Sequence, residues 1–363
     1  MESMAIEAPA SALRGLMNNP HVMEILPDRG VFSTGFAPAG GTPTSSQVTP
    51  SGVTAVGAPV TGSDGSGVGV AIMDTGIDLA NSDLAVASQT YSAFGGSCND
   101  DNGHGTAVAG LVSALNNTIG IVGVAPNSKP YCVKVLDSTG TGADSSIIAG
   151  LNWIYTNWNL VTPNIKVVNM SLGRAGTVND NSSYRTAVQQ LYNLGIVVVN
   201  AVGNDPAVGV PSRVPATYPE VFAIGSTTAL KGTTSCKLQS AIVASTASWY
   251  TTDGKFDPTT KIGITISAPG EDSETATSTC GVSSVGMLTL QKGGGTTRAS
   301  GTSISAPLVA GVVARLIQKG NTGVENIRNM IRSGAQLVGT APYDTRYVGY
   351  TFDGQREGVA KAP

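Results

Sequence analysis

The stretch Val70–Asp78, VAIMDTGID, decides the fold of this chain. It continues an apolar run, Val68–Met73, that has the length of one strand, and it ends in Asp74 followed by a glycine turn. A short apolar run bounded by turn residues is typical of a strand that is covered on both faces, as in a parallel sheet. Functional residues of such sheets lie at the carboxyl ends of the strands, which is where Asp74 stands.

Strand and helix signals alternate downstream of this run. Apolar strand-length segments are separated by segments with helical spacing, which predicts an α/β fold with a mostly parallel central sheet and helices on both faces. We expect strands at 131–136, 165–170 and 196–201 and helices at 106–115, 144–158, 182–194, 303–319 and 324–333. Between 226 and 300 the alternation is lost, and we expect antiparallel strands and long loops there, with apolar islands at 241–244 and 262–269.

Two further glycine-flanked motifs supply chemistry. Asn102–Gly110 reads NGHGTAVAG, and Ser300–Gly311 reads SGTSISAPLVAG. A seryl hydroxyl needs an imidazole to take its proton and a carboxylate to orient that ring. The chain contains only two histidines, and the other one, His21, lies in the N-terminal segment. The candidates are therefore Asp74, His104 and Ser303.

Each motif has an ordinary alternative when it is taken alone. Asp-Thr-Gly is a common turn after a strand, His104 could begin a helix with a local hydrogen bond, and Gly-Thr-Ser could be a helix N-cap. Three such motifs in the order Asp, His, Ser, each at the end of an expected element, favour a serine hydrolase over these alternatives.

With these motifs the chain resembles the subtilisin family of serine endopeptidases, from about Gln47 to about Ala335. The segments YCVKVLDSTGTG (131–142), VVNMSLG (167–173) and VVVNAVGN (197–204) resemble the family as well. The chain departs from the family at Ala107 and Leu308, where the family usually has histidine. The resemblance implies a three-layer fold and peptide-bond hydrolysis through an acyl-enzyme on Ser303, with His104 as general base and Asp74 orienting it.

The resemblance also implies the residues that bind substrate. Asn204 is implied as the side-chain donor to the oxyanion, beside the main-chain N–H of Ser303 at a helix start. Two backbone edges are implied to hold an extended peptide as an added strand. They are Gly140, Thr141 and Gly142 on one side and Ser171, Leu172 and Gly173 on the other. Arg213 is either a solvated arginine or the base of the pocket for the residue before the cut.

Calcium is the cofactor that the resemblance implies. The side-chain ligands would be Gln47, Asp83 and Asn117, and the backbone ligands the carbonyl groups of Leu115, Ile119 and Ile121. Hard oxygen ligands in a flexible loop suit Ca²⁺ better than zinc. The alternative is that the loop at 115–126 is only a bulge after a helix.

Composition limits the partners. Charged residues are 12% of the 363 residues, the formal net charge is -3, and Lys and Arg form no stripe, so nucleic acid is not an expected partner. The sequence contains no run of 18 or more apolar residues, which is the length that a membrane-spanning helix requires. We expect a monomer that acts on proteins or peptides and binds its own propeptide.

The four cysteines are not spaced as a zinc site, and the residues alone leave open whether they are free thiols or disulfides. The resemblance favours the pairs Cys98–Cys132 and Cys236–Cys280, which would suit an oxidising compartment and a secreted protein. Met1–Ala10 has neither a basic start nor a long apolar run, so we expect the secretion signal to be absent from this chain.

Residues 12–32 resemble the closing helix and strand of a subtilisin propeptide. We therefore expect a propeptide remnant at 1–36, a linker with the processing site at 37–46, a catalytic domain at 47–338 and an extended tail at 339–363. A disordered remnant is the alternative for the N-terminal segment. For the whole chain the alternatives are a zymogen or binding scaffold with this fold, or an esterase or peptide ligase that uses the same three residues.

Overall fold

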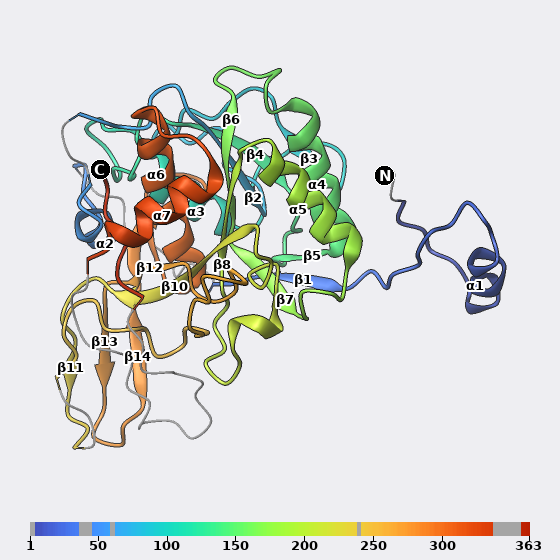
Figure 1. Ribbon diagram of the computed structural model, residues 1–363. Helices are drawn as coiled ribbons and strands as arrows, with labels where there is room; N and C mark the ends of the chain where they lie inside the picture. Colours follow the sequence, from blue (N-terminus) through green and yellow to red (C-terminus); the bar gives the residue numbers. More distant parts are fainter. Residues whose placement is uncertain (1–3, 36–45, 59–61, 238–240, 337–356) are drawn as a thin grey trace.

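A seven-stranded parallel sheet forms the centre of the computed structural model, which describes residues 4–35, 46–58, 62–237, 241–336 and 357–363 (Figure 1). Every pair of neighbours in this sheet is parallel. In spatial order the strands are β12 (Ile266–Glu271), β10 (Val221–Thr228), β8 (Val197–Ala201), β6 (Ile165–Met170), β2 (Gly69–Asp74), β4 (Lys129–Lys134) and β3 (Tyr91–Ser92).

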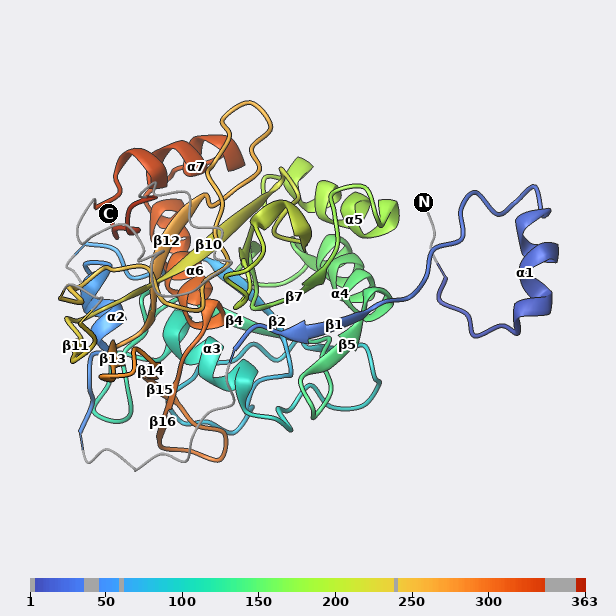
Figure 2. The same cartoon turned by 90° about the horizontal axis from the view of Figure 1, so that it is seen from below.

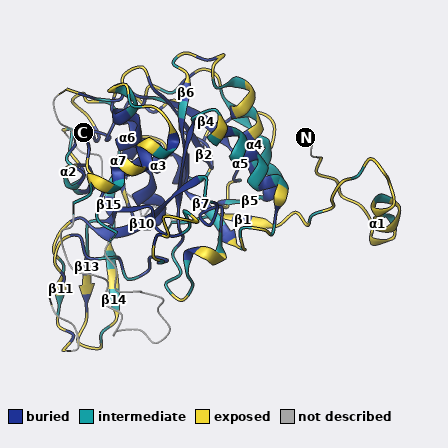
Figure 3. Cartoon of the chain, in the orientation of Figure 1, coloured by how far each residue is buried: buried dark blue, intermediate teal, exposed yellow. Residues whose placement is uncertain are grey.

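Helices cover both faces of this sheet, so the body has three layers (Figures 1 and 3). The side chains of one face pack with α3 (His104–Ser113), α6 (Thr302–Gln318), α7 (Val324–Ser333) and the short α2 (Ser51–Ala55). Those of the other face pack with α4 (Asp144–Asn157) and α5 (Ser182–Asn193). Because β2 and β8 are buried on both faces, each contains an unbroken apolar run, at 70–73 and 197–199.

A second sheet lies beside the carboxyl ends of the central strands and takes in the N-terminal segment. Its order is β5 (Thr141–Ala143), β1 (Gly30–Ser33), β7 (Leu172–Ala175) and β9 (Arg213–Val214), with Val210–Ser212 as a 3-10 turn before β9. Figures 1 and 2 show β1 running between β5 and β7, while α1 (Ala10–Met17) stands away from the body. None of the α1 residues is buried.

The region 226–300 differs in part from its prediction. The apolar island at 262–269 leads into β12, a parallel strand that continues the central sheet beside β10, and 241–244 forms no strand. Antiparallel pairs are present, as β13 (Ser273–Ala276) with β14 (Val282–Val285), and β15 (Met287–Leu290) with β16 (Thr296–Ala299). β11 (Thr233–Thr234) adds to β13 in parallel. The prediction was wrong for β12 because an apolar run does not reveal the direction of its neighbour.

The other predicted helices and strands lie within a few residues of their expected bounds. The cysteines pair as Cys98–Cys132 and Cys236–Cys280, which confirms the pairing that the resemblance implied. Most of the expected tail lies outside the described residues. Of its described part, Val359 bridges both Ser267 and Gln336, and Ala360 is buried. No helix among the described residues is long and apolar enough to cross a membrane.

Candidate active site

Asp74 and His104 meet at the carboxyl end of β2. Asp74 is the last residue of that strand, and His104 is the first residue of α3, which Gly103 precedes with a φ of 116°. Nδ1 of His104 lies 2.7 Å from Oδ1 of Asp74, and both side chains are buried. A carboxylate in this position fixes the ring and its tautomer and leaves Nε2 available to accept a proton.

A second carboxylate lies behind the imidazole. Asp100 accepts hydrogen bonds from the main chain of Gly103 and Thr106 and from the hydroxyl of Thr75, all at 2.9 Å. Burial lowers the pKa of His104, but the charges of Asp74 and Asp100 and the hydrogen bond to Asp74 raise it, and the net direction is upward. The arrangement therefore favours imidazolium, the form that a general base adopts after taking a proton.

Ser303 lies in the first turn of α6, after Gly301, whose φ is 136°. A Cβ on Gly301 would lie 2.9 Å from Nδ2 of Asn204, so both the backbone angle and the space require glycine. Pro307 has no N–H to bond the Ser303 carbonyl four residues before it. The hydroxyl of Ser171 donates to that carbonyl instead, at 2.8 Å, and so ties the nucleophile's backbone to the start of β7.

The chain's own residue Thr34 occupies the position of an acyl group beside Ser303. Its carbonyl oxygen accepts from the Ser303 N–H at 3.1 Å and from Nδ2 of Asn204 at 2.8 Å. Oδ1 of Asn204 accepts from the N–H of Thr302 at 2.9 Å and from its hydroxyl at 3.0 Å, which turns Nδ2 toward Thr34. Two donors that converge on one carbonyl oxygen have the arrangement that an oxyanion hole requires.

The reacting atoms of His104 and Ser303 face the peptide bond between Thr34 and Gly35. A Cβ built on Gly35 would overlap Oγ of Ser303 and would lie 2.9 Å from Nε2 of His104. Among the residues that the structure describes, neither Nε2 nor Oγ has a hydrogen-bond partner. Nε2 of His104 and Oγ of Ser303 therefore both lie next to Gly35, beside the Thr34 carbonyl.

Main-chain pairing holds the residues before Thr34. β1 is antiparallel to β5, with Phe32 opposite Thr141 and Val31 opposite Gly142, and to β7, with Phe32 opposite Gly173. The N–H of Thr34 donates to the Ser171 carbonyl at 3.0 Å. The N–H of Ser33 donates to the Gly140 carbonyl, also at 3.0 Å. The two predicted edges thus lie on either side of one extended segment, and Leu172 pairs with residue 33.

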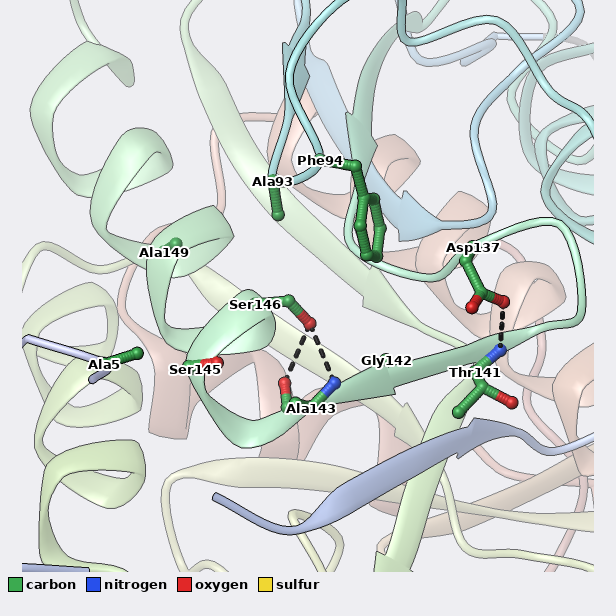
Figure 4. Close-up of a pocket in the computed structure, with 10 residues that line it drawn as sticks. All are labelled: Ala5, Ala93, Phe94, Asp137, Thr141, Gly142, Ala143, Ser145, Ser146 and Ala149. Atoms are coloured by element: carbon green, nitrogen blue, oxygen red, sulfur yellow. Dashed lines mark hydrogen bonds between the residues drawn. The ribbon is translucent and has the colours of Figure 1, made fainter. Parts of the chain in front are cut away.

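A hollow of about 460 Å³ borders β5 where α4 begins (Figure 4). Ser146 there donates to the Ala143 carbonyl and accepts from its N–H, and Asp137 accepts from the Thr141 N–H. These bonds hold β5 in its extended form beside β1. The Phe94 ring forms part of the wall of the hollow.

The six predicted calcium ligands also come together. Nε2 of Gln47 lies 2.7 to 3.4 Å from four oxygen atoms, which belong to Leu115, Asn117, Ile119 and Ile121. Asp83 joins them by accepting from the Asn117 amide at 2.8 Å and from the Ile121 N–H at 3.0 Å. The Gln47 amide can be turned so that its oxygen faces the other four oxygens. Together with the Asp83 carboxylate, these oxygens fit the donor set that Ca²⁺ prefers.

Arg213 forms an ion pair with Asp205 at 2.6 Å, which balances its charge. A Cβ on Gly203 would lie 3.6 Å from Nε of Arg213, and that Nε is buried without a hydrogen-bond partner. The arginine therefore borders the strand end that carries Asn204.

Sequence reasoning missed the part of the site that the N-terminal segment supplies. The sequence predicts a propeptide remnant at 1–36 and a linker with the processing site at 37–46, and residues 36–45 lie outside the described residues. The structure instead brings Thr34 and Gly35 to Ser303. The side chains of Thr34 and Gly35 do not indicate this position in the sequence, because it follows from the main-chain pairing of β1. Ser171 stands inside a motif that was recognised and Asp100 lies two residues before another, but the sequence does not show their contacts.

Comparisons with known proteins show the family to which the chain belongs. The model of the subtilase family matches residues 65–351. The chain is 33% identical over 286 residues to subtilisin DY of Bacillus licheniformis, covering 78% of this chain and 88% of that protein. It is 35% identical over 283 residues to the alkaline elastase YaB of Bacillus sp. (strain YaB), covering 77% of this chain and 62% of that protein.

A solved structure shares the fold. The crystal structure of a cold adapted subtilisin-like serine proteinase matches with a TM-score of 0.59 and 23% identity, over 84% of this chain and 92% of that one. Fold and relatives together define a serine endopeptidase with a three-layer α/β architecture. The chain belongs to the subtilase family.

Proposed function

We propose that this chain cleaves peptide bonds through an acyl-enzyme on Ser303 and that its first substrate is its own Thr34–Gly35 bond. The observation that carries the proposal is the Thr34 carbonyl, which two donors hold beside Ser303. A strand that is held on both sides and presents a carbonyl to an oxyanion hole is in the position of a substrate before attack.

The steps follow from the contacts. Oγ of Ser303 attacks the carbonyl carbon of Thr34 while Nε2 of His104 takes the hydroxyl proton, and Asp74 stabilises the imidazolium. The oxyanion lies between the Ser303 N–H and the Asn204 amide. His104 then gives its proton to the nitrogen of Gly35, which leaves as a new N-terminus. Water, with its proton taken by His104, hydrolyses the Thr34 ester in the second half of the reaction.

The same groove would take other substrates once the N-terminal segment has left it. Gly140, Thr141 and Gly142 on one edge, and Ser171, Leu172 and Gly173 on the other, bind main-chain atoms, and such binding places little demand on sequence. Until it leaves, the segment blocks the groove, since residues 30–35 cover Ser303, whose side chain is fully buried. The uncleaved chain is thus the zymogen, and residues 1–34 are the propeptide part.

Further contacts favour retention of this propeptide after the cut. Asp28 accepts from the N–H and the hydroxyl of Ser145 at the start of α4, at 2.9 and 2.6 Å, and Glu24 accepts from the Ser182 hydroxyl at the start of α5. Acidic groups at helix N-termini are favoured by the helix dipole. We expect the cut propeptide to remain bound and to inhibit until it is displaced or degraded.

We also propose a structural Ca²⁺ held by Gln47, Asp83 and Asn117 together with the carbonyl groups of Leu115, Ile119 and Ile121. The convergence of these oxygens supports the proposal. Bound there, the ion would tie residue 47 to the loop after α3. The two disulfides support secretion, because such bonds persist in oxidising compartments.

Mass spectrometry of the purified chain tests the proposal. The unaltered protein should yield two fragments separated between Thr34 and Gly35, and Ser303→Ala should remain intact. Ser305→Ala is the matched control, since it removes another fully buried hydroxyl from the same helix and should be processed normally. Cleavage of the Ser303→Ala chain at the same bond would overturn the assignment of the nucleophile. An intact wild-type chain that also fails to react with a fluorophosphonate would overturn the activity.

A further inference from the structure

Recognition of the N-terminal segment extends beyond the strand that enters the active site. Arg29 immediately precedes β1, and its Nη1 lies 2.6 Å from Oδ2 of Asp180. Its carbonyl accepts from the N–H of Asp144 at 2.9 Å, so its place follows from the same main-chain pairing as β1. Arg29 is the sixth residue before the Thr34–Gly35 bond. Any peptide that pairs in this register brings its own sixth residue to Asp180.

Asp180 is fixed in place before a ligand arrives. Its carboxylate accepts from Nη1 and Nη2 of Arg174 at 2.9 and 3.2 Å and from the Thr177 N–H at 3.3 Å. The Asp180 side chain is 14% exposed, whereas that of Arg29 is 42% exposed. The acceptor therefore belongs to the framework, and the arginine is the part that reaches it from outside.

The charges at this corner do not balance without Arg29. Arg174 also binds Asp144 through two parallel hydrogen bonds, at 2.7 and 2.8 Å, so one guanidinium serves two carboxylates. Tyr184 and Tyr218 lie nearby, and burial raises the pKa of each phenol, so both are neutral. Among the described residues, the cations that lower the pKa of Asp180 are Arg174 and Arg29. One negative charge remains when Arg29 departs.

From this geometry we infer that Asp180, held by Arg174, is a subsite that selects arginine or lysine at the sixth residue before the cleaved bond. The inference rests on the proposed function and names a class of preferred substrate: extended segments with a basic residue at that position. Exposed ion pairs contribute little free energy, so we expect a preference of about threefold to fivefold over alanine. A glutamate at that position would be disfavoured further by repulsion from the same carboxylate.

The test uses the self-processed enzyme, freed of its cut propeptide, and three peptides that copy residues 28–36, with arginine, alanine or glutamate at the position of Arg29. The wild-type kcat/KM should fall in that order. Asp180→Asn keeps the size of the side chain but removes its charge, and it should cleave the three peptides at equal rates, close to the wild-type rate for the alanine peptide. Glu220→Gln is the matched control because its carboxylate pairs with Arg185, and it should keep the wild-type order.

Salt provides a second readout that needs no substitution. The ratio of kcat/KM between the arginine and glutamate peptides should shrink in part as NaCl rises toward 1 M, where the Debye length falls to about 3 Å, close to the separation of the two charges. Equal wild-type kcat/KM values for the three peptides at low salt would overturn the subsite. So would an Asp180→Asn variant that still prefers the arginine peptide to the alanine and glutamate peptides. If Asp180→Asn does not fold, a wild-type ratio that salt leaves unchanged would also overturn it. Failure of the wild type to cut any of the peptides would count against the proposed function instead.

Discussion

The carbonyl oxygen of Thr34 lies 3.1 Å from the main-chain nitrogen of Ser303. This relationship places a peptide bond of the chain at the nucleophile without any bound substrate. Asn204 donates to the same oxygen at 2.8 Å, so a main-chain group and a side-chain group share the charge that would form on it. The proposed site of the uncleaved chain therefore already holds one of the chain's own carbonyl groups.

The first prediction concerns Asn204. Asn204→Ala removes one of the two donors to the oxyanion and should lower kcat while it leaves KM nearly unchanged, since the bond strengthens as negative charge develops. Removal of such a donor from a subtilisin costs on the order of 10²–10³ in kcat, and we expect a similar loss here. Steady-state rates on a chromogenic peptide measure it. A loss confined to KM would show that Asn204 binds the ground state only.

The second prediction concerns Gly35. A methyl group on this residue would overlap Oγ of Ser303, so Gly35→Ala should displace either the bond or the nucleophile. Misplacement by about 1 Å can cost on the order of 10²-fold in rate, and we expect self-cleavage to slow at least about tenfold. The measurement is the time course of the fragment that begins at residue 35 after cell-free synthesis. Gly15→Ala is the control, because nothing lies within 4 Å of its added methyl group. Equal rates for both variants would contradict the observed approach of Gly35.

The third prediction concerns pH. Catalysis needs neutral His104, and because Asp74 and Asp100 raise its pKa in spite of burial, activity should rise with pH through a value above the ordinary 6.5. Release of the segment that covers the ring would reduce its burial, and so would not move the pKa downward. A profile of kcat/KM from pH 5 to 9 on a peptide without ionisable side chains measures this. An acid limb centred below 6.5 would contradict the electrostatic role of the two carboxylates.

The order of the elements and the three reactive side chains could be predicted because local sequence determines them. Asp74, His104 and Ser303 each stand beside glycines at the end of an element, where composition and periodicity carry information. The direction of β12 could not be predicted, because it depends on which strand lies beside it. The ion pair between Arg29 and Asp180 joins residues that are 151 positions apart, and no local pattern marks it.

The N-terminal segment shows the same limit more sharply. Ser33, Thr34 and Gly35 have the composition of a linker, and the sequence predicts processing only after them, at 37–46. Their position in the active site follows from main-chain hydrogen bonds to β5 and β7, which any residue except proline can form. Side-chain patterns therefore could not distinguish a loose connection from a bound substrate.

The fourth prediction concerns calcium. Ca²⁺ at about one hundred times its Kd would stabilise the folded state by about 2.7 kcal/mol, so EDTA should lower the Tm. Asp83→Asn removes the single carboxylate of the proposed site and should abolish the response to EDTA. Asp257→Asn, in an exposed loop, is the control and should keep it. An unchanged Tm on chelation of the wild-type protein would contradict the site.

The fifth prediction concerns a buried carboxyl that catalysis does not use. Glu271, the last residue of β12, is fully buried. Burial, and then the charge of Glu274, raise its pKa well above 4.5, and the hydroxyls of Ser248 and Ser284 lower it only in part. The folded protein therefore holds this proton more tightly than the unfolded chain.

A raised carboxyl pKa has a definite consequence for stability. The contribution of Glu271 is fully present below the unfolded value of about 4.5 and is lost as pH rises from there through the folded value. The Tm should therefore fall between pH 5 and 8, and Glu271→Gln, which stays neutral, should reduce that fall and raise the Tm at pH 8. Glu325→Gln, at a side chain that is 33% exposed, should change neither. Calorimetry across this range measures the effect, and a Glu271→Gln variant that is less stable than wild type at pH 8 would contradict it.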